Sequence, residues 1–235
     1  RSMFFKAEAF DQNLSLWNIS SGTEFYFMFW GADLMSTNQG AASTPSPYDY
    51  FSYKFNTKSD LETAIADWIA DEAAATRTYG DINNWNVAAI TDFSKLFRNQ
   101  ETFNSDISNW DVSSGTNFNS MFMFTQFNQD ISSWDVSNGN NFGGMFMYAN
   151  VFNKDISNWD VGSGDNFRSM FFKAEAFDQN LSLWDVSNGT NFNAMFTGAD
   201  SFNQDISSWD VSNGTNFSIM FYSADLMISN QEAPE

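Results

Sequence analysis

The chain contains no cysteine, no histidine and only three prolines among its 235 residues. Without cysteine it cannot form a disulfide, and without either residue it lacks the usual ligands of zinc and iron–sulfur sites. Histidine is also the side chain that most often transfers protons near neutral pH, so this kind of acid–base chemistry is excluded. A membrane-spanning helix needs about 18 or more consecutive apolar residues. The sequence has no such run, and we expect no membrane span in it.

Positive charge is scarce as well. Ten lysines and arginines stand against 29 aspartates and glutamates, which gives a formal net charge of −19. Nucleic-acid binding depends on lysine and arginine contacts to phosphates, so we expect no nucleic-acid partner. Hydrophobic residues make up 43% of the chain and include 27 phenylalanines. The core is therefore expected to consist largely of aromatic rings.

A repeat of about 25 residues occupies most of the sequence. Its pattern is Phe-Asn-x-Asp-Ile-Ser-x-Trp-Asp-Val-Ser-x-Gly-x-Asn-Phe-x-x-Met-Phe. One tryptophan recurs in each unit, at Trp85, Trp110, Trp134, Trp159, Trp184 and Trp209. A fixed period of this length is typical of solenoids, in which each coil stacks on the next. We therefore predict a repeat solenoid with one short parallel strand, near 116–118, and one short helical turn, near 120–122, in each coil.

The beginning of the chain repeats part of its end. Arg1–Trp17 is identical in sequence to Arg168–Trp184. We interpret residues 1–38 as the tail of a preceding repeat array and the chain as a portion of a longer protein. Residues 39–50 are small, polar and proline-containing, which is typical of a linker.

The second array is expected to have its own cap. Residues 51–79 combine an aromatic lead-in strand with a helix from Asp60 to about Arg77, in which Ser59 is the N-cap and Glu62 completes a capping box. The end of a repeat array must be covered, and this helix precedes the repeats directly. Residues 80–235 are then predicted to form a solenoid of about six repeats with a C-terminal cap.

The stretch Phe-Asn-Ser-Asp-Ile-Ser-Asn-Trp-Asp-Val-Ser, which begins at Phe103, resembles the repeat of the BspA-like leucine-rich-repeat surface proteins. The likeness covers roughly residues 55–226 and 4–35. In that family a valine and a methionine usually occupy the places that Gly115 and Phe118 hold here. The resemblance implies a leucine-rich-repeat-like solenoid with a structural or adhesive role outside the cell or on its surface, and no catalytic residues.

From these observations we expect an extracellular or cell-surface structural and adhesive protein, a segment of a filament or stalk built from tandem solenoid arrays. Its partners would then be neighbouring arrays or other copies of itself. The alternative is an adhesin module that binds glycans or surface proteins. We expect no enzymatic activity, because a repeat gives each carboxylate nearly the same surroundings, whereas a hydrolase needs two carboxyl groups in different ones.

Two rows of aspartates are candidate sites. The first row contains Asp81, Asp106, Asp130, Asp155 and Asp205, and the second contains Asp111, Asp135, Asp160, Asp185 and Asp210. Calcium prefers several oxygen ligands and is the one cofactor candidate, with Asp106, Asp130, Asp155 and Asp205 as its ligands. The alternative is that each carboxylate accepts a backbone N–H in its own turn.

Other polar and aromatic positions recur with the same period. We expect the tryptophans to form a buried structural ladder, with a sugar-stacking surface as the alternative. We expect an amide ladder at Asn117, Asn141, Asn166, Asn191 and Asn216. The glycosylation candidates, which are Asn-x-Ser/Thr sequences, are Asn13, Asn18, Asn180, Asn188, Asn213 and Asn216.

Overall fold

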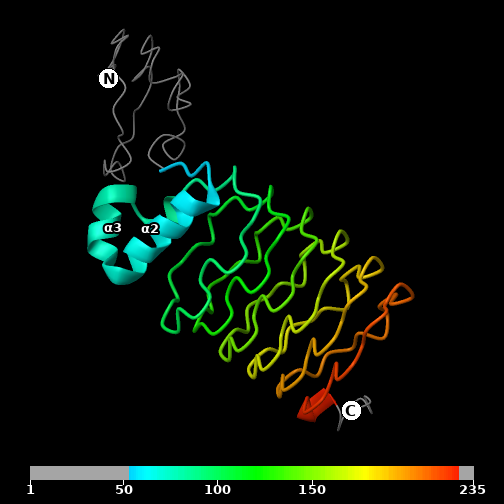
Figure 1. The fold of residues 1–235 in the computed structure, drawn as a ribbon. Coiled ribbons are helices and arrows are strands. Elements are labelled where there is room, and N and C mark those ends of the chain that lie inside the picture. The colour runs from blue at the N-terminus through cyan, green and yellow to red at the C-terminus, as the bar shows by residue number, and fades with distance from the viewer. Residues whose placement is uncertain (1–52, 228–235) are drawn as a thin grey trace.

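The computed structural model describes residues 53–227. The predicted array tail at 1–38, the linker at 39–50 and the end of the chain after Met227 therefore lie outside the described residues. Two helices stand at one end of a row of coils that lie side by side (Figure 1). They are α2, Lys58–Ala70, and α3, Glu72–Tyr79, and the short 3₁₀ helix η1, Ile82–Asn84, leads into the first coil.

The predicted single helix is two helices, and its N-cap is not Ser59. Thr57 has an extended backbone and its side chain accepts the N–H of Asp60 at 3.2 Å, so α2 begins two residues earlier than expected, at Lys58. The chain then breaks at Asp71, which is also extended and whose carboxylate accepts the N–H of Ala74 at 2.9 Å. Aspartate caps a helix N-terminus better than it occupies a helix interior, which favours the break.

Each coil contributes one bridging residue instead of the expected strand. The parallel bridges join Asp92 to Asn117, Asn117 to Asn141, Asn141 to Asn166, Asn166 to Asn191 and Asn191 to Asn216. The backbone turns just before and just after each bridge. In one coil the N–H of Gly115 donates to the carbonyl of Val112 at 2.7 Å, and Ser120 has a left-handed φ of 56°.

The expected helical turn near 120–122 is also absent from the described coils. Two left-handed residues, Ser120 and Phe124, with φ of 56° and 59°, bracket this segment, and a right-handed helix cannot include them. The segment instead turns alternate N–H groups toward the next coil. Those of Phe118, Ser120, Phe122 and Phe124 donate to Asn141, Gly143, Met145 and Met147 at 2.8–2.9 Å.

This set of four hydrogen bonds recurs between every pair of successive coils and always points in the same direction. It begins with Phe93, Lys95, Phe97 and Asn99 and ends with Phe192, Ala194, Phe196 and Gly198, which donate to Asn216, Ser218, Met220 and Tyr222. In this part of each coil the N–H groups donate forward and the carbonyls accept from the coil behind. The two ends of the row of coils consequently differ chemically.

Columns of parallel phenylalanine rings fill the core. One column runs through Phe93, Phe118, Phe142, Phe167, Phe192 and Phe217, with centroids 5.2–5.7 Å apart. A second runs through Phe97, Phe122, Phe146, Phe171, Phe196 and Phe221. Stacked aromatic pairs contribute about 0.5–1.5 kcal/mol each beyond their burial. These columns therefore stabilise the contact between every coil and the next.

The helices cover the first coil. Leu61, Ile65 and Trp68 of α2 are buried against it, and the indole N–H of Trp68 donates to Ser105 at 3.0 Å. The ammonium group of Lys58 donates to the carbonyl of Ser94 at 2.7 Å. Among the described residues, no helix is long and apolar enough to cross a membrane.

Candidate functional site

The first aspartate row consists of turn carboxylates. Asp106, Asp130, Asp155 and Asp205 each accept the backbone N–H two residues later at 2.9 Å, from Ser108, Ser132, Ser157 and Ser207. Asn180 stands at the same position in its coil and accepts from Ser182 at the same distance. An uncharged amide can therefore replace the carboxylate, which is the behaviour expected of a turn residue and not of a cation ligand.

These hydrogen bonds also change the acidity of the row. The backbone and hydroxyl of Ser132 lower the pKa of Asp130 below its ordinary value. Ser157 lowers the pKa of Asp155 in the same way, while repulsion from the charge of Asp130 raises it by a smaller amount. The carboxylates of neighbouring coils thus repel each other, and the turn hydrogen bonds outweigh that repulsion.

The second aspartate row has the same local geometry. Its carboxylates accept backbone N–H groups at 3.0–3.1 Å, from Ser113, Ser137, Gly162, Ser187 and Ser212. Hydrogen bonds from Ser137 and Ser187, first from the hydroxyl and then from the backbone, lower the pKa of Asp135 and Asp185. Within residues 53–227, no three acidic, histidine or cysteine residues are grouped closely enough to hold a metal ion. Neither row brings its members together into a calcium site.

The tryptophans lie inside the coils and join each coil to the one before it. From Trp110 onward each indole N–H donates to a carbonyl of the preceding coil, at Ile82, Ile107, Ile131, Ile156 and Leu181. The rings of Trp85 and Trp110 are stacked, with their centroids 6.4 Å apart. The later ring of Trp134 instead packs at a tilt against Phe122, with centroids 6.2 Å apart. All six rings are buried, so they offer no sugar-stacking surface.

The side chains of the recurring asparagines mainly accept hydrogen bonds within their own turns, and they do not form a continuous amide ladder. Asn117, Asn141, Asn166, Asn191 and Asn216 each accept the N–H two residues later. A side-chain bond between two of them runs from the amide nitrogen of Asn166 to the oxygen of Asn141, at 2.9 Å.

The glycosylation candidates are partly described. Asn13 and Asn18 lie outside the described residues. Asn180, Asn188 and Asn213 are exposed, and Asn216 is half-buried. The amide nitrogens of Asn188 and Asn213 donate to Gly162 and Ser187 of the preceding coils at 2.8 Å, so a glycan at either nitrogen would compete with this contact.

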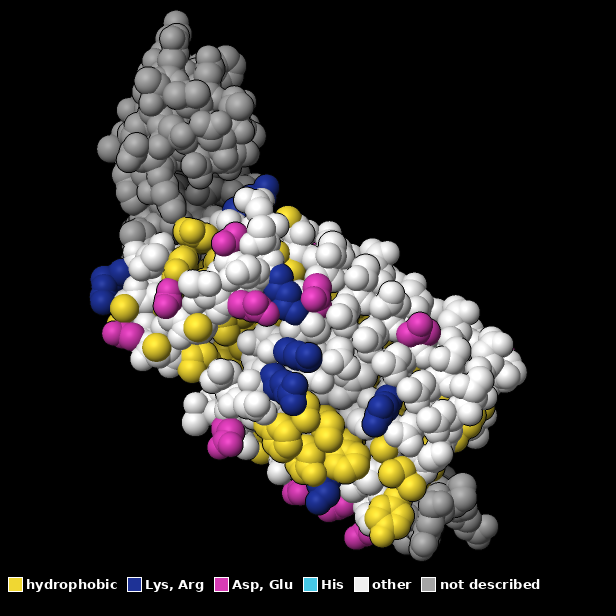
Figure 2. All heavy atoms as spheres, viewed as in Figure 1, with side chains coloured by type: hydrophobic (Ala, Val, Ile, Leu, Met, Phe, Trp, Pro, Cys, Tyr) yellow, Lys and Arg dark blue, Asp and Glu magenta, His cyan; other side chains and the backbone are white. Residues whose placement is uncertain are grey.

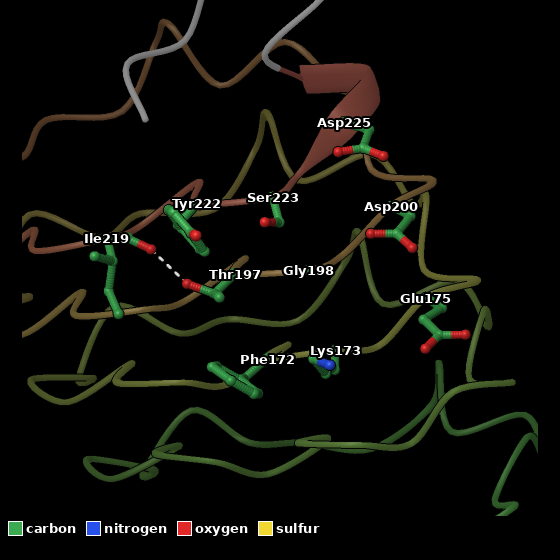
Figure 3. A pocket seen from close by; sticks show the side chains of 10 residues that line it. All are labelled: Phe172, Lys173, Glu175, Thr197, Gly198, Asp200, Ile219, Tyr222, Ser223 and Asp225. Carbon is green, nitrogen blue, oxygen red and sulfur yellow. Dashed lines mark hydrogen bonds between the residues drawn. The ribbon is translucent and has the colours of Figure 1, made fainter.

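Sequence reasoning missed a pocket of about 600 Å³ near the last coils. Glu175, Asp200 and Asp225 follow one another along one side of it, and Phe172 and Tyr222 line the other (Figure 3). The three acidic residues are spaced by one repeat, so each belongs to a different coil. The signal in the sequence was this spacing. It is easily overlooked because the equivalent residue in an earlier coil, Asn150, is uncharged.

The pocket is electrostatically strained. Burial raises the pKa of Asp200, and the negative charges of Asp225 and Glu175 raise it further, while Lys173 acts in the opposite direction. A positively charged or hydrogen-donating ligand would relieve this repulsion. The aromatic side could contact an apolar face of the same ligand.

An aromatic patch occupies the same side of the molecule further toward the helices. Phe124 and Tyr148 stack with centroids 4.4 Å apart, and Tyr148 contacts Phe172 of the next coil at 5.4 Å. On the face shown in Figure 2, hydrophobic side chains gather beside lysines and arginines, and acidic side chains lie around this cluster. The patch leads along the coils to the aromatic wall of the pocket.

Comparison with known proteins yields a family and no relative of known activity. The chain matches the family described as "Mycoplasma protein of unknown function, DUF285" in three segments, residues 1–68, 69–182 and 155–233. No curated protein and no solved structure matches it. The successive and overlapping matches agree with the recurring hydrogen bonds and ring columns described above. The chain is therefore a tandem-repeat protein that belongs to the DUF285 family.

Proposed function

We propose that the chain is a structural and adhesive segment of an extracellular or cell-surface protein, in which a leucine-rich-repeat-like solenoid of the BspA-like type serves as a stiff part of a filament or stalk. It acts without catalysis and through its shape. Neighbouring arrays or further copies of the chain are its main partners.

The observation that carries this proposal is the constancy of the contact between coils. The same four backbone hydrogen bonds and the same phenylalanine stacks occur at each junction from the coil of Phe93 to that of Phe217. A stack with identical junctions resists bending at any one of them, because bending would break hydrogen bonds and unstack buried rings together. Such a stack is suited to holding other groups at a fixed distance.

Two measurements test the proposal. Antibodies against the purified chain should label intact cells of the source organism, and mild protease treatment of these cells should remove the labelling. Labelling that requires permeabilised cells would contradict the proposed location. Small-angle scattering of the purified chain should fit a rigid elongated body, and a profile typical of a flexible chain of coils would contradict the structural role.

The pocket beside Asp200 favours a second function, that of a glycan- or protein-binding adhesin module. The aromatic ring of Tyr222 and the carboxylates of Asp200 and Asp225 could bind an amino sugar or a basic side chain through stacking and charge. A glycan array and a basic-peptide array should then show saturable binding that Tyr222→Ala and Asp200→Asn abolish. Leu183→Ala, on an exposed side chain elsewhere, is the matched control. Unchanged binding in the two pocket variants would exclude this site.

A further inference from the structure

One edge of the row of coils departs from the repeat. If the coil of Phe93 is counted as the first, the phenylalanine of this column is the same in all six coils, whereas the residues five and six positions after it differ from coil to coil. We call these two positions the edge row. They are Arg98 and Asn99, Met123 and Phe124, Met147 and Tyr148, Phe172 and Lys173, Thr197 and Gly198, and Tyr222 and Ser223. The hydrogen bonds between coils at the edge row are made by the backbone, so these side chains are free to differ.

Aromatic rings follow one another along the edge row and then leave a gap. Phe124 and Tyr148 stack with centroids 4.4 Å apart, and Tyr148 contacts Phe172 of the fourth coil at 5.4 Å. The fifth coil contributes no ring to the edge row, and the next ring belongs to Tyr222 of the sixth coil. The row of rings is thus interrupted for the length of one coil.

The pocket of about 600 Å³ lies at this gap. The edge row of the fifth coil consists of Thr197 and Gly198, which are small. Thr197 is buried, and its hydroxyl donates to the carbonyl of Ile219, so it already has a hydrogen-bond partner. Phe172 and Tyr222 lie on either side of the gap, with Thr197 between them (Figure 3).

The gap has room for one flat group. Within the core, successive rings of the Phe93 column are 5.2–5.7 Å apart, so one ring for each coil fills the space between its neighbours. Phe172 and Tyr222 are two coils apart. A planar group between them therefore takes the place of the ring that the fifth coil lacks, and it stacks on the rings at both sides.

Negative charge accompanies the gap. The position eight residues after the Phe93 column is uncharged in the second and third coils, as Gln126 and Asn150. Around the gap it is acidic, as Glu175, Asp200 and Asp225, which line the side of the pocket opposite to the two rings (Figure 3). Burial, followed by the charges of Asp225 and Glu175, raises the pKa of Asp200. The pocket thus favours a ligand that is both planar and positively charged.

The edge row already holds a cation over one of its rings. The ammonium of Lys173, the basic residue of the pocket, lies 5.8 Å from the ring centroid of Tyr148. This contact shows that a positive charge is accommodated on the rings of the edge row. The single charge of Lys173 does not balance the three carboxylates of the pocket.

We propose that the pocket binds the guanidinium group of an arginine side chain presented by a partner protein. The guanidinium is planar, so it stacks between Phe172 and Tyr222, and its N–H groups donate to the carboxylates on the opposite side. The ammonium of a lysine is a compact and strongly hydrated charge that lacks this plane. An amino sugar carries its charge on a ring that is not planar. The inference rests on the binding function proposed above for the same pocket and names its ligand.

Isothermal titration calorimetry of the purified chain tests this inference with the peptide acetyl-Gly-Arg-Gly-amide, which should bind saturably at one site. The same peptide with lysine in place of arginine should bind about fivefold more weakly or worse. The peptide with citrulline keeps the plane but has no charge, and it should bind about tenfold more weakly or worse. Glucosamine is the fourth probe and should bind more weakly than the arginine peptide.

Variants of the gap connect the binding to this place. Thr197→Phe gives the fifth coil the residue that the fourth coil has at this position, Phe172, so the fold tolerates it. The new ring should fill the gap and abolish binding of the arginine peptide. Thr197→Ser keeps the small size and the hydroxyl, and as the matched control it should bind like the wild type. Tyr222→Leu changes a side chain that is 53% exposed, so the fold tolerates it too, and it should remove the preference for arginine over lysine.

The absence of binding by the arginine peptide, equal binding of the arginine and lysine peptides, or unchanged binding in Thr197→Phe would each overturn the inference. Binding of glucosamine alone would reject arginine as the ligand and leave the binding function of the pocket in place. A chain that binds none of the four probes would reject both. None of these results bears on the structural role, which surface labelling and scattering test separately.

Discussion

At the scale of single residues, the glycine that recurs from Gly115 onward leaves room for a phenylalanine ring. A Cβ on Gly164 would lie 2.5 Å from Cζ of Phe167 and 2.9 Å from the carbonyl oxygen of Val161. The same overlap occurs at Gly115, Gly139, Gly189 and Gly214, whereas the first coil has Ile90 at this position. Glycine inside a strand usually weakens it. These glycines instead allow a large ring three residues later to fold back over the backbone and join its column.

Gly164→Ala should therefore destabilise the protein by about 1–3 kcal/mol, the usual cost of overpacking a core. Gly162→Ala is the matched control, because the nearest atom to its new Cβ would be a carboxylate oxygen of Asp160 at 3.2 Å, on the exposed surface. Urea unfolding measures both. A Gly164→Ala variant as stable as the Gly162→Ala control would contradict the packing argument. Adding Phe167→Leu to Gly164→Ala should reduce the loss of stability, because the smaller side chain leaves room for the new Cβ.

The aspartate of each turn should be replaceable by asparagine but not by alanine. Asp130→Ala leaves the N–H of Ser132 without its acceptor and should cost about 0.5–1.5 kcal/mol. Asp130→Asn should stay close to the wild type at neutral pH, as Asn180 indicates. Because the folded-state pKa of Asp130 lies below 3.8, its carboxylate stabilises the fold above that pH and loses the effect as the pH falls through the folded value.

Urea unfolding at several pH values tests this prediction. The difference in free energy of unfolding between the wild type and the alanine variant should shrink below about pH 3.8. The same difference between the asparagine and alanine variants should not shrink. An asparagine variant as unstable as the alanine variant at neutral pH would show that the charge matters more than the turn.

At the scale of elements, α2 is held on the first coil by one charged contact among many apolar ones. The ammonium of Lys58 donates to the carbonyl of Ser94 at 2.7 Å and to the carboxylate of Asp92 at 3.0 Å. This carbonyl is one of those that accept from a preceding coil elsewhere in the row. The ammonium group of Lys58 therefore supplies the hydrogen bond to this carbonyl that a backbone N–H of the preceding coil supplies in the later coils.

Lys58→Met should lower the free energy of unfolding by about 1.5–3 kcal/mol, the range for hydrogen bonds to charged groups. Lys54→Met changes the same charge on an exposed side chain and serves as the control. Hydrogen exchange would localise the effect, with faster exchange in α2 than in the middle coils. Equal effects of the two substitutions would mean that charge alone, and not the contact with Ser94, matters.

The two helices are tied to each other by Tyr79. Its hydroxyl donates to the carboxylate of Asp67 at 2.8 Å, and this bond, with burial, raises its pKa to about 12. A raised folded-state pKa means that the contribution to stability is complete below the ordinary value of 10.0 and is lost as the pH rises toward about 12.

Melting temperatures recorded from neutral pH upward should therefore fall above about pH 10 in the wild type more steeply than in Tyr79→Phe. The phenylalanine variant keeps the ring contacts with Tyr53 and Trp85 and lacks only the hydroxyl. Parallel pH profiles of the two proteins would argue against the bond to Asp67.

At the scale of the whole molecule, the net charge of −19 destabilises the fold, because the repeat places aspartates of successive coils in rows where they repel one another. The charge of Asp185 raises the pKa of Asp210 in the next coil, so repulsion acts along the second row too, although hydrogen bonds from Ser212 keep that pKa lowered. Salt at about 0.15 M limits such interactions to about 8 Å. General screening should thus stabilise the fold.

The melting temperature should rise between about 10 mM and 150 mM sodium chloride. Calcium chloride should have no further effect at equal ionic strength, because the described carboxylates form no group suited to a metal ion. A melting temperature that rises with calcium beyond the sodium series, and falls again with a chelator, would restore the calcium hypothesis for Asp106, Asp130, Asp155 and Asp205.

The sequence alone determined what each coil does by itself. The period, the turn-forming aspartates and the burial of aromatic residues such as Trp134 and Phe142 could be predicted, because they depend on residue type and local spacing. The structure decided what depends on neighbours about 25 residues away. Single bridges replaced strands because the backbone turns just before and just after each bridge, and the pocket formed because Glu175, Asp200 and Asp225 come from three coils. The direction of the hydrogen bonds between coils makes the two ends of the row of coils different. This direction follows from the left-handed residues in each coil, whose positions could not be predicted from the residue pattern.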